Sequence, residues 1–449
     1  MNLREELDVP GEFPPEVLAE AEAAAKRPLP SHAVDLRDID FVTLDPPGAR
    51  DLDQAYAIEE TGDGWIVRYA IADVAHFVDP GGAIDREAHR RGVTFYLPDG
   101  KAPLHPPELS EGAASLLPDV DRPALVWTIE VGADGEDGPA RLERSIVRSR
   151  EQRAYETAHD PVLQAVGEAL EGAEARRGGV SLDLPAQEVD ADGDRWVLRA
   201  DRVLPIEGWN EQLSLLAGRC AGRLMLDGGV GLLRTMPPPD EGVVRELRAL
   251  AGALDIGWPA GATYGEVVRS IDRSDRRGVV FLQHAVRAMR GAGYTAFDGA
   301  LPDLREHAAV AAPYAHVTAP LRRLADRHAN EVVLALCAGT SIPAWARDAL
   351  PALGEVMSAA NRKAAAVERA VIDLAEAMTL ASCVGAVLDA TVVSVRGDDA
   401  IVAVADPVVV ASSAADGSWK PGDAVRVEVA GADPAARRVD LRPAVSPYR

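Results

Sequence analysis

The chain has 449 residues, of which 47% are hydrophobic, and its formal net charge is −24 at pH 7. This length predicts two or three domains with a substantial core, and no apolar run is long enough to span a bilayer. Residues 1–6 are acidic and resemble no secretory signal, while the three cysteines (Cys220, Cys337 and Cys383) lie far apart. We therefore expect a cytoplasmic protein without a membrane segment, a disulfide framework or a cysteine zinc site.

The acidic balance opposes nucleic-acid binding over the whole surface, because phosphate contacts depend on Lys and Arg. A basic channel remains compatible with it, since the local field at a cleft matters more than the total charge. Nearly all positive charge is arginine, which binds phosphate through two hydrogen bonds. Compositional bias toward arginine is the alternative explanation. The only lysines are Lys26, Lys101, Lys363 and Lys420.

The first part of the chain is expected to form a helical arm followed by a β-rich region. The arm covers residues 1–33, and its helix, at 14–26, is ended by prolines. From residue 34 to about 131, β-branched and apolar runs alternate with Gly and Asp turns. The clearest elements predicted there are strands at 65–71 and 125–129 and a charged helix at 83–91.

From residue 207 onward, apolar residues recur at helical spacing. Leu213, Leu216, Cys220 and Leu224 mark one face of the first helix, and such stripes are core positions. Further helices are predicted at 244–254, 280–289, 321–336 and 355–381. Strands early and helices late predict an α+β domain over residues 34–382.

After residue 383 the pattern changes to short β runs separated by turns. A small barrel of the oligonucleotide-binding type, at residues 383–449, fits this spacing, although other small β domains would fit it too. The predicted strands lie at 390–395, 400–404, 424–429 and 438–441.

One acidic segment, residues 45–55 (DPPGARDLDQA), carries most of the functional argument. Clustered carboxylates repel one another unless a proton or a cation shares them. The Pro-Pro-Gly turn folds the chain back, so Asp45 can approach Asp51 and Asp53. Oxygen ligands on a tight loop suit Mg²⁺. The alternative is a solvated acidic loop, which an acid-rich chain produces by chance.

Several separated motifs accompany this segment in a fixed order. They are 71–78 (IADVAHFV), 91–98 (RGVTFYLP), 106–110 (PPELS), 115–116 (SL) and 316–326 (HVTAPLRRLAD). Together they resemble the catalytic (RNB) domain of the RNase II/RNase R exoribonuclease family, over roughly residues 35 to 383. The resemblance implies a mixed sheet with helices around a narrow RNA channel, and a C-terminal barrel of the OB/S1 type. We expect this chain to be a compact form of the family that lacks N-terminal cold-shock barrels.

The resemblance also implies the reaction, which is hydrolysis of single-stranded RNA from a free 3′ end to 5′-mononucleotides with Mg²⁺, or alternatively Mn²⁺. Two such ions activate a water and stabilise the leaving oxygen. By the family's pattern, Asp45, Asp51, Asp53 and Gln54 form the metal shell, and activity depends most on Asp53. The family usually has an aspartate at the position of Gln54. A glutamine oxygen can still coordinate Mg²⁺, but it brings no negative charge.

The remaining residues implied by the resemblance contact RNA. Arg322 lies near the scissile phosphate, where a fixed guanidinium stabilises developing charge. Tyr96 stacks on the 3′-terminal nucleotides and Tyr155 is a second channel position, because aromatic stacking tolerates any base. Ordinary alternatives are a core role for the tyrosines and a solvated helix charge for the arginines. Arg323 and Arg91 complete the predicted RNA contacts.

Two other functions stay open at this point. One is an RNA-binding relative with weak or no catalysis, because Gln54 replaces a metal-site aspartate. The other is an exonuclease on single-stranded DNA, since no residue can be assigned to the 2′-hydroxyl group. No obligate protein partner is expected. The barrel has one large aromatic side chain before Tyr448, Trp419, so we expect its own affinity for RNA to be modest.

Overall fold

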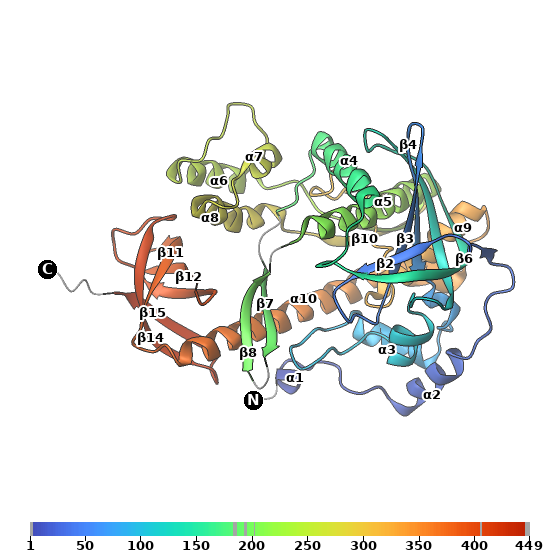
Figure 1. Cartoon of the computed structure of the whole chain (residues 1–449), viewed down its shortest axis with the longest axis horizontal. Helices are drawn as coiled ribbons and strands as arrows, with labels where there is room; N and C mark the ends of the chain where they lie inside the picture. The colour runs from blue at the N-terminus through green and yellow to red at the C-terminus, as the bar shows by residue number, and fades with distance from the viewer. Residues whose placement is uncertain (1–2, 183–185, 193–194, 202, 405, 445–449) are drawn as a thin grey trace.

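The computed structural model describes residues 3–182, 186–192, 195–201, 203–404 and 406–444. A mixed sheet with helices occupies one end of the molecule and a small β-barrel the other (Figure 1). The long helix α10 (Ala344–Ala381) runs between them and contacts both. This architecture confirms the predicted α+β domain followed by a barrel. In the part of the chain described, no helix is both long and apolar enough to cross a bilayer.

The N-terminal segment contains two helices, α1 (Leu3–Glu6) and α2 (Pro15–Ala24). Helix α2 starts with a proline in its first turn, where no backbone hydrogen bond is lost, and packs on α3 (Ala83–Arg91). Around α1, Arg4 pairs with Asp99 and Asp8 with Lys363 of α10. Glu6 pairs with Arg437 of the barrel. The arm therefore ties three parts of the molecule together.

The main sheet has the strand order β1-β6-β2-β3-β4-β5. Strand β6 also pairs with β5, so the hydrogen bonding runs from β2 through β3, β4 and β5 back to β6. Buried side chains such as Trp127, Tyr69 and Val67 fill its core. The predicted strands lie within β4 and β5. The bounds are β1 (Val34–Asp35), β2 (Phe41–Asp45), β3 (Gln54–Thr61), β4 (Gly64–Ala72), β5 (Asp121–Gly132) and β6 (Asp137–Ala154).

Helices α4 (Pro161–Arg177), α5 (Pro205–Gly228) and α9 (Leu324–Ala338) pack against this sheet, and α10 packs against α9. The predicted face of α5 is confirmed, because Leu213, Leu216 and Cys220 are fully buried. Helix α9 begins at Leu324, three residues later than predicted, since residues 318–323 form a turn. Helix α10 begins at Ala344 rather than 355, because Pro351 interrupts the sequence pattern without ending the helix.

A smaller helical group, α6 to α8, has its own apolar core around Leu247, Ala251 and Phe281. Next to it, an antiparallel hairpin (β7 and β8) lies across α10, and strands β9 and β10 pair beside α10 (Figure 1). The sequence had not indicated either strand pair. The bounds are β7 (Ala186–Asp192), β8 (Arg195–Asp201), β9 (Val230–Thr235), α6 (Glu241–Ala253), α7 (Tyr264–Ser270), α8 (Arg276–Ala285) and β10 (Gly293–Asp298).

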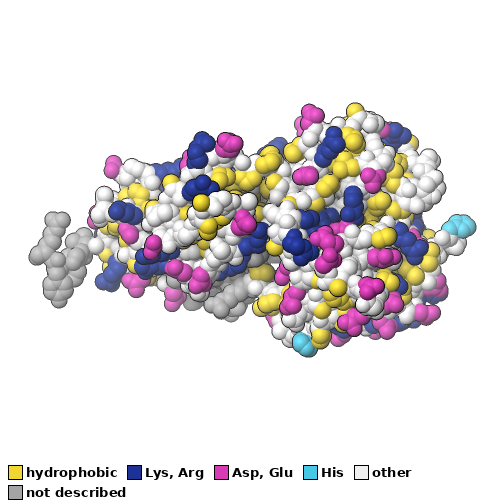
Figure 2. All heavy atoms as spheres, turned by 90° about the horizontal axis from the view of Figure 1, so that it is seen from above, with side chains coloured by type: hydrophobic (Ala, Val, Ile, Leu, Met, Phe, Trp, Pro, Cys, Tyr) yellow, Lys and Arg dark blue, Asp and Glu magenta, His cyan; other side chains and the backbone are white. Residues whose placement is uncertain are grey.

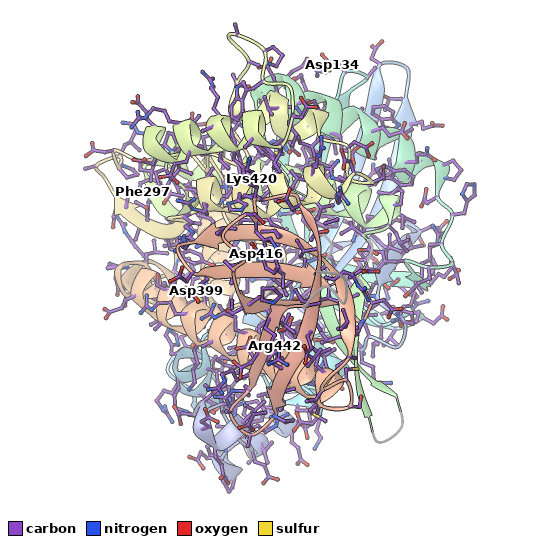
Figure 3. The ribbon with its side chains drawn as sticks, turned by 90° about the vertical axis from the view of Figure 1, so that its left-hand side faces the viewer. Asp134, Phe297, Asp399, Asp416, Lys420 and Arg442 are labelled. Atoms are coloured by element: carbon purple, nitrogen blue, oxygen red, sulfur yellow. The ribbon has the colours of Figure 1, made fainter. Side chains whose placement is uncertain are left out.

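The C-terminal strands form a closed barrel in the order β11-β12-β13-β15-β14. Alternate valines, including Val392, Val402 and Val427, point into its core. Four strands match the predicted runs, whereas β13 was missed. Figure 3 shows charges of both signs on this end, from Asp399 and Asp416 to Lys420 and Arg442. The bounds are β11 (Val387–Arg396), β12 (Asp399–Val404), β13 (Val409–Ala414), β14 (Ala424–Asp433) and β15 (Arg438–Pro443).

Candidate active site

The acidic loop, residues 45–53, connects the end of β2 to the start of β3. Val42 pairs with Tyr56 in these antiparallel strands, and continuing that register sets Asp45 opposite Asp53. Gly48 adopts a φ of +79°, which lets the chain turn after the two prolines. On the far side of the loop, the Ser115 hydroxyl accepts from the Leu52 N–H at 3.0 Å and donates to the Arg50 carbonyl at 2.6 Å. Local turn geometry and one tertiary hydrogen-bonding residue thus shape the loop.

Asp53 is the most deeply buried of the three aspartates, with 5% of its surface exposed. Its Oδ1 accepts from the Leu321 N–H at 2.8 Å, and its Oδ2 lies 3.6 Å from Arg322 Nε. Burial raises the pKa of Asp53 to about 8 despite these contacts. Burial, and then repulsion from Asp51, raises the pKa of Asp45 to about 7. The two carboxylates have too little positive charge around them to stay ionised without a further cation.

Asp51 lies closer to solvent and has its own partner. Lys101 Nζ is 2.7 Å from Asp51 Oδ1 and 2.8 Å from Glu111 Oε1. Lys101, one of the chain's few lysines, therefore lies at the edge of the acidic loop, next to a fourth carboxylate, that of Glu111. The sequence analysis had assigned no role to Lys101 or Glu111.

The donor set fits a divalent cation, because it offers buried carboxylate oxygens whose charge is not balanced. It does not gather all three aspartates on one ion. Oxygens bound to a single Mg²⁺ lie within about 4.2 Å of each other, since each is about 2.1 Å from the metal. The ligand atoms of Asp45, Asp51 and Asp53 do not meet even a 4.8 Å limit as a group of three.

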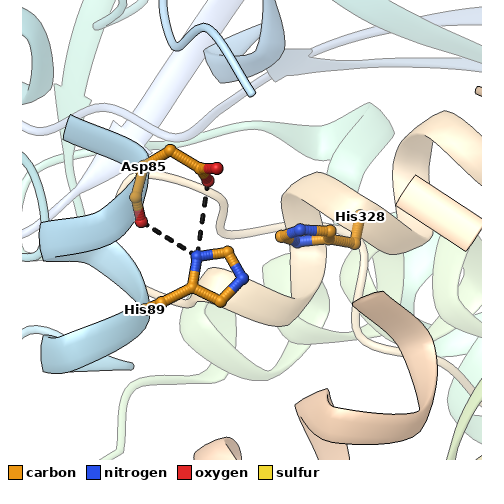
Figure 4. Close-up of side chains that lie close together, drawn as sticks. All are labelled: Asp85, His89 and His328. Atoms are coloured by element: carbon orange, nitrogen blue, oxygen red, sulfur yellow. Dashed lines mark hydrogen bonds and ion pairs between the residues drawn. The ribbon is translucent and has the colours of Figure 1, made fainter. Parts of the chain in front are cut away.

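One group of three does meet that limit in the part of the chain described, and it lies elsewhere. Asp85 and His89 of α3 meet His328 of α9 (Figure 4). The His89 ring nitrogen Nδ1 is 2.9 Å from the Asp85 carbonyl oxygen, and Asp85 Oδ1 pairs with Arg327 Nη1 at 2.5 Å. The Gly81 N–H donates to the other carboxylate oxygen at 2.7 Å. Arg327 already supplies the positive charge that a metal would bring, so this group is structural.

Gln54, the first residue of β3, has both ends of its amide engaged. Its Nε2 donates to the Thr318 carbonyl at 2.6 Å, and its Oε1 accepts from the Tyr69 hydroxyl at 2.9 Å. The Tyr69 hydroxyl also contacts Ser214 Oγ at 2.8 Å. One lone pair of the Gln54 oxygen is therefore used within the protein, which leaves the other for an external ligand.

The turn at 318–323 carries both predicted arginines, but in different environments. The Arg322 side chain is 45% exposed, and within the described chain its ion-pair partner is Asp53. Arg323 is mostly buried, and its Nη2 pairs with Asp326 at 2.8 Å. Asp326 also accepts from the Ala319 N–H at 2.7 Å. Arg323 thus holds the turn that presents Arg322, and a direct contact with RNA stays a prediction.

The two predicted tyrosines lie near different carboxylates of the acidic loop: the charges of Asp51 and Asp53 act on Tyr96, and the charge of Asp45 acts on Tyr155. Tyr96 is 57% exposed, and desolvation, followed by the charge of Asp51, raises the pKa of its hydroxyl. The segment before it pairs with the arginine turn, since the Thr94 N–H donates to the Arg322 carbonyl at 3.0 Å. The Tyr155 hydroxyl accepts from Asn210 of α5 at 3.2 Å, and burial, opposed by that bond, raises its pKa to about 12. An exposed ring at Tyr96 is available for stacking.

Arg91 requires a correction. Its side chain is fully buried, and Nε pairs with Glu87 at 2.7 Å. Its other nitrogens donate to the carbonyls of Pro103 and Gly11, and the guanidinium lies 3.7 Å from the centre of the Phe13 ring. No part of Arg91 is left for an RNA phosphate. The sequence motif around it was informative, but the residue serves the packing of α3 against the N-terminal arm.

The face of the molecule seen from above does not carry one sign of charge. Figure 2 shows Lys and Arg interspersed with Asp and Glu, and several basic side chains gather near the middle of this face. The net charge of −24 is therefore compatible with a local basic region.

The fold and the site define a mixed α/β domain with a buried carboxylate centre, followed by a five-stranded barrel. The chain belongs to the RNB family: the family model described as "RNB domain" matches residues 33–338. A second model, the "RNase II-type exonuclease C-terminal S1 domain", matches residues 386–444. Both matches confirm the resemblance inferred from the motifs.

Individual relatives agree with this assignment. The chain is 28% identical to ribonuclease R of Escherichia coli over 427 residues, which cover 85% of this chain and 52% of that protein. It spans about half the length of the curated relatives it matches. Its fold is similar to Mycoplasma genitalium RNase R in complex with ribose-methylated single-stranded RNA, with a TM-score of 0.87, 17% identity and coverage of 98% and 77% of the two chains. The fold is also similar to yeast Ssd1, described as a pseudonuclease, with a TM-score of 0.68, 17% identity and coverage of 90% and 53%.

Proposed function

We propose that this chain is a divalent-cation-dependent exoribonuclease that hydrolyses single-stranded RNA from its 3′ end and releases 5′-mononucleotides. One observation carries the proposal. Asp53, which is buried, and Asp45, which is partly buried, occupy opposed register positions of β3 and β2 and have raised pKa values, and the partly exposed guanidinium of Arg322 lies next to Asp53. Carboxylates whose pKa stays raised although an arginine lies nearby fit a site that is completed by cations and a phosphate.

The roles follow from the surroundings of each residue. Asp45, Asp51, Asp53 and the oxygen of Gln54 would hold Mg²⁺ or Mn²⁺. A bound cation supplies Lewis-acid stabilisation of charge on the scissile phosphate. Arg322 contributes a second positive charge at the same phosphate.

Two aromatic residues would position the substrate. Tyr96 offers an exposed face for the terminal base, and Tyr155 lines the site from the side of α5. Stacking is indifferent to base identity, which suits an enzyme that consumes any sequence. Arg323 keeps the turn in place through Asp326.

The wider organisation is part of the same proposal. Residues 1–33 form an arm, residues 34–382 the catalytic domain and residues 383–449 a barrel that assists RNA binding. Single-stranded RNA with a free 3′ end is the partner, no protein partner is required, and the protein acts in the cytoplasm.

A labelled oligoribonucleotide tests this function. With a 5′ label and Mg²⁺, the wild-type chain should shorten the RNA stepwise and release nucleoside 5′-monophosphates, whereas chelator should stop the reaction. The deoxyribonucleotide of the same sequence should resist. Digestion of both polymers at equal rates would favour an exonuclease without selectivity for RNA, and internal cleavage would contradict the exonuclease proposal.

A second candidate is an RNA-binding relative with weak or no turnover. Gln54 favours it, because its amide is bonded to Thr318 and Tyr69 and adds no negative charge to the metal shell. The similarity to a pseudonuclease concerns the fold alone. Tight, salt-sensitive RNA binding without release of mononucleotides would support this candidate.

A further inference from the structure

Lys101 contacts the acidic loop, and the proposed function gives it no role. It lies in a short hairpin, residues 95–102, in which the backbones of Phe95 and Ala102 exchange two hydrogen bonds, at 3.0 and 2.8 Å. Tyr96 and Lys101 are the next residues inside this pair, one on each side of the hairpin. The hairpin therefore brings a cation to the acidic loop together with the proposed stacking residue.

The Lys101 ammonium joins two carboxylates. Its Nζ lies 2.7 Å from Asp51 Oδ1 and 2.8 Å from Glu111 Oε1. The side chains of Lys101, Asp51 and Glu111 are 23%, 18% and 26% exposed, so water and salt screen these charges less than they screen an exposed pair. One contact of the ammonium thus engages a carboxylate that the proposed function assigns to the metal shell.

This ion pair sets Asp51 apart from the other two aspartates of the loop. The ligand atoms of Asp45, Asp51 and Asp53 do not come together as one close group, whereas Asp51 has a partner within hydrogen-bonding distance. A divalent cation at the Asp51 carboxylate competes with the ammonium, because two cations that share one carboxylate repel each other. Lys101 therefore opposes cation binding at Asp51.

The residue type suits a cation that can be displaced. The chain uses arginine for nearly all of its positive charge, yet it has a lysine at this position. An arginine holds a carboxylate through two hydrogen bonds in a fixed plane, whereas a lysine presents one point charge on a flexible stem. Glu111 remains as a partner after Asp51 is released, so displacement does not leave the ammonium unpaired.

We propose that Lys101 is a positioning residue that controls divalent-cation binding at the acidic loop by occupying Asp51. In the free protein the ammonium pairs with both Asp51 and Glu111, and it withdraws to Glu111 when Asp51 becomes a metal ligand. Lys101 thereby weakens cation binding in the absence of RNA. This role rests on the proposed function, in which Asp51 is a ligand of Mg²⁺ or Mn²⁺.

Titration of the full chain with Mn²⁺ in the absence of RNA, followed by electron paramagnetic resonance, tests the proposal. Lys101→Met should tighten Mn²⁺ binding at least ~5-fold, because the competing charge is removed. The matched control is Lys420→Met, which removes the same charge from the barrel, at the other end of the molecule (Figures 1 and 3), and should change the affinity less than ~2-fold. In a chain that carries Asp51→Asn, Lys101→Met should also have less than a ~2-fold effect, because the lysine acts through Asp51.

A lysine that only supports the loop would give the opposite sign, since its loss would weaken Mn²⁺ binding. Three results would overturn the proposal: unchanged or weaker binding in Lys101→Met, equal tightening by Lys420→Met, or tightening that persists in the Asp51→Asn chain. If Lys101→Met melts early, Lys101→Arg decides. It keeps the charge but should weaken Mn²⁺ binding at least ~3-fold, because a guanidinium holds Asp51 through two bonds. An affinity equal to that of wild type would contradict a displaceable cation.

The proposed function is judged separately, by RNA hydrolysis with the wild-type chain. Hydrolysis together with an unchanged Mn²⁺ affinity in Lys101→Met removes only the role of Lys101. Tighter Mn²⁺ binding in that variant without hydrolysis by the wild-type chain removes only the enzyme.

Discussion

Asp53 and Asp85 are both buried aspartates, but their surroundings shift the pKa of the carboxylate in opposite directions. Around Asp85, burial alone would raise the pKa, but His89 and Arg327 hold it well below its usual range. Around Asp53, the effect of burial exceeds that of Arg322 and the Leu321 N–H, and the pKa rises to about 8. The nearest positive charge there, Arg322, is 3.6 Å away and half exposed.

The difference separates a structural carboxylate from one prepared for a ligand. The Asp85 carboxylate contacts the Gly81 N–H, the Arg327 guanidinium and, at 3.4 Å, the His89 ring, so a metal would have to displace an arginine from a buried position. Asp53 has one backbone N–H and one half-exposed arginine at 3.6 Å, so its charge is only partly balanced and a cation from outside can complete the site. The closer cluster of potential metal ligands is thus the less suitable metal site, because net local charge decides.

The largest effect is expected from Asp53→Asn. Removal of this carboxylate should lower the rate of RNA hydrolysis by at least ~10³-fold, because charge stabilisation at the reacting phosphate is the main source of catalysis. RNA affinity should change little, which a filter-binding assay checks. The control is Asp298→Asn, an exposed residue paired with Arg347, which should stay within ~2-fold of wild type. Equal activity of the two variants would remove Asp53 from the site.

The second prediction concerns the satisfied carboxylate. Arg327→Met leaves Asp85 buried without its main partner, so the free energy of unfolding should fall by about 3–5 kcal/mol. Urea denaturation measures this fall. Arg347→Met breaks an exposed pair and should leave the urea midpoint almost unchanged. If Mg²⁺ restored the free energy of unfolding of the Arg327→Met variant, the cluster of Asp85, His89 and His328 would bind metal.

The third prediction uses pH. Asp45 and Asp53 have pKa values of about 7 and 8 in the folded chain, above the ordinary value of 3.8. At a pH between 3.8 and these raised values, the folded chain therefore binds more protons than the unfolded chain. Their contribution to stability is therefore present at low pH and is lost as the pH rises toward 8. Without metal, the Tm should fall between pH 5.5 and 8.5 by at least ~2 °C more than in the double variant Asp45→Asn/Asp53→Asn.

Mg²⁺ should compensate for that loss, because a cation replaces the protons. Its gain in Tm should be larger at pH 8.5 than at pH 5.5, where protons compete for the same oxygens. An equal gain at both pH values, or the same gain in the double variant, would place the bound ion elsewhere.

The smallest effect is expected from Gln54→Asp. A carboxylate in place of the amide adds charge to the metal shell, so the Mg²⁺ concentration for half-maximal rate should fall by roughly 3- to 10-fold. Gln54→Asn is the matched control, because it has the same length as aspartate without the charge, and it should not lower the requirement. A higher requirement in Gln54→Asp would mean that the bonds to Thr318 and Tyr69 matter more than charge.

Much of the fold could be predicted from the sequence, because local rules dominate there. Helical spacing located the buried face of α5, and alternating valines marked four of the five barrel strands. The Pro-Pro-Gly turn and the carboxylates after it placed the acidic loop, since a turn of a few residues depends on its own chemistry. The pairs β7–β8 and β9–β10 were missed. β9 and β10 pair across almost sixty residues, so no local signal joins them.

The site depended on contacts between distant residues, and these were decided by tertiary structure. Gln54 is bonded to Thr318, 264 positions away, and Arg91 is enclosed by residues from the N-terminal arm. Lys101 reaches the acidic loop only because the sheet and its connections fold back on it. By itself the sequence determined where carboxylates and arginines stand along the chain. Folding decided which of them are neutralised, because burial and opposite charge act through space.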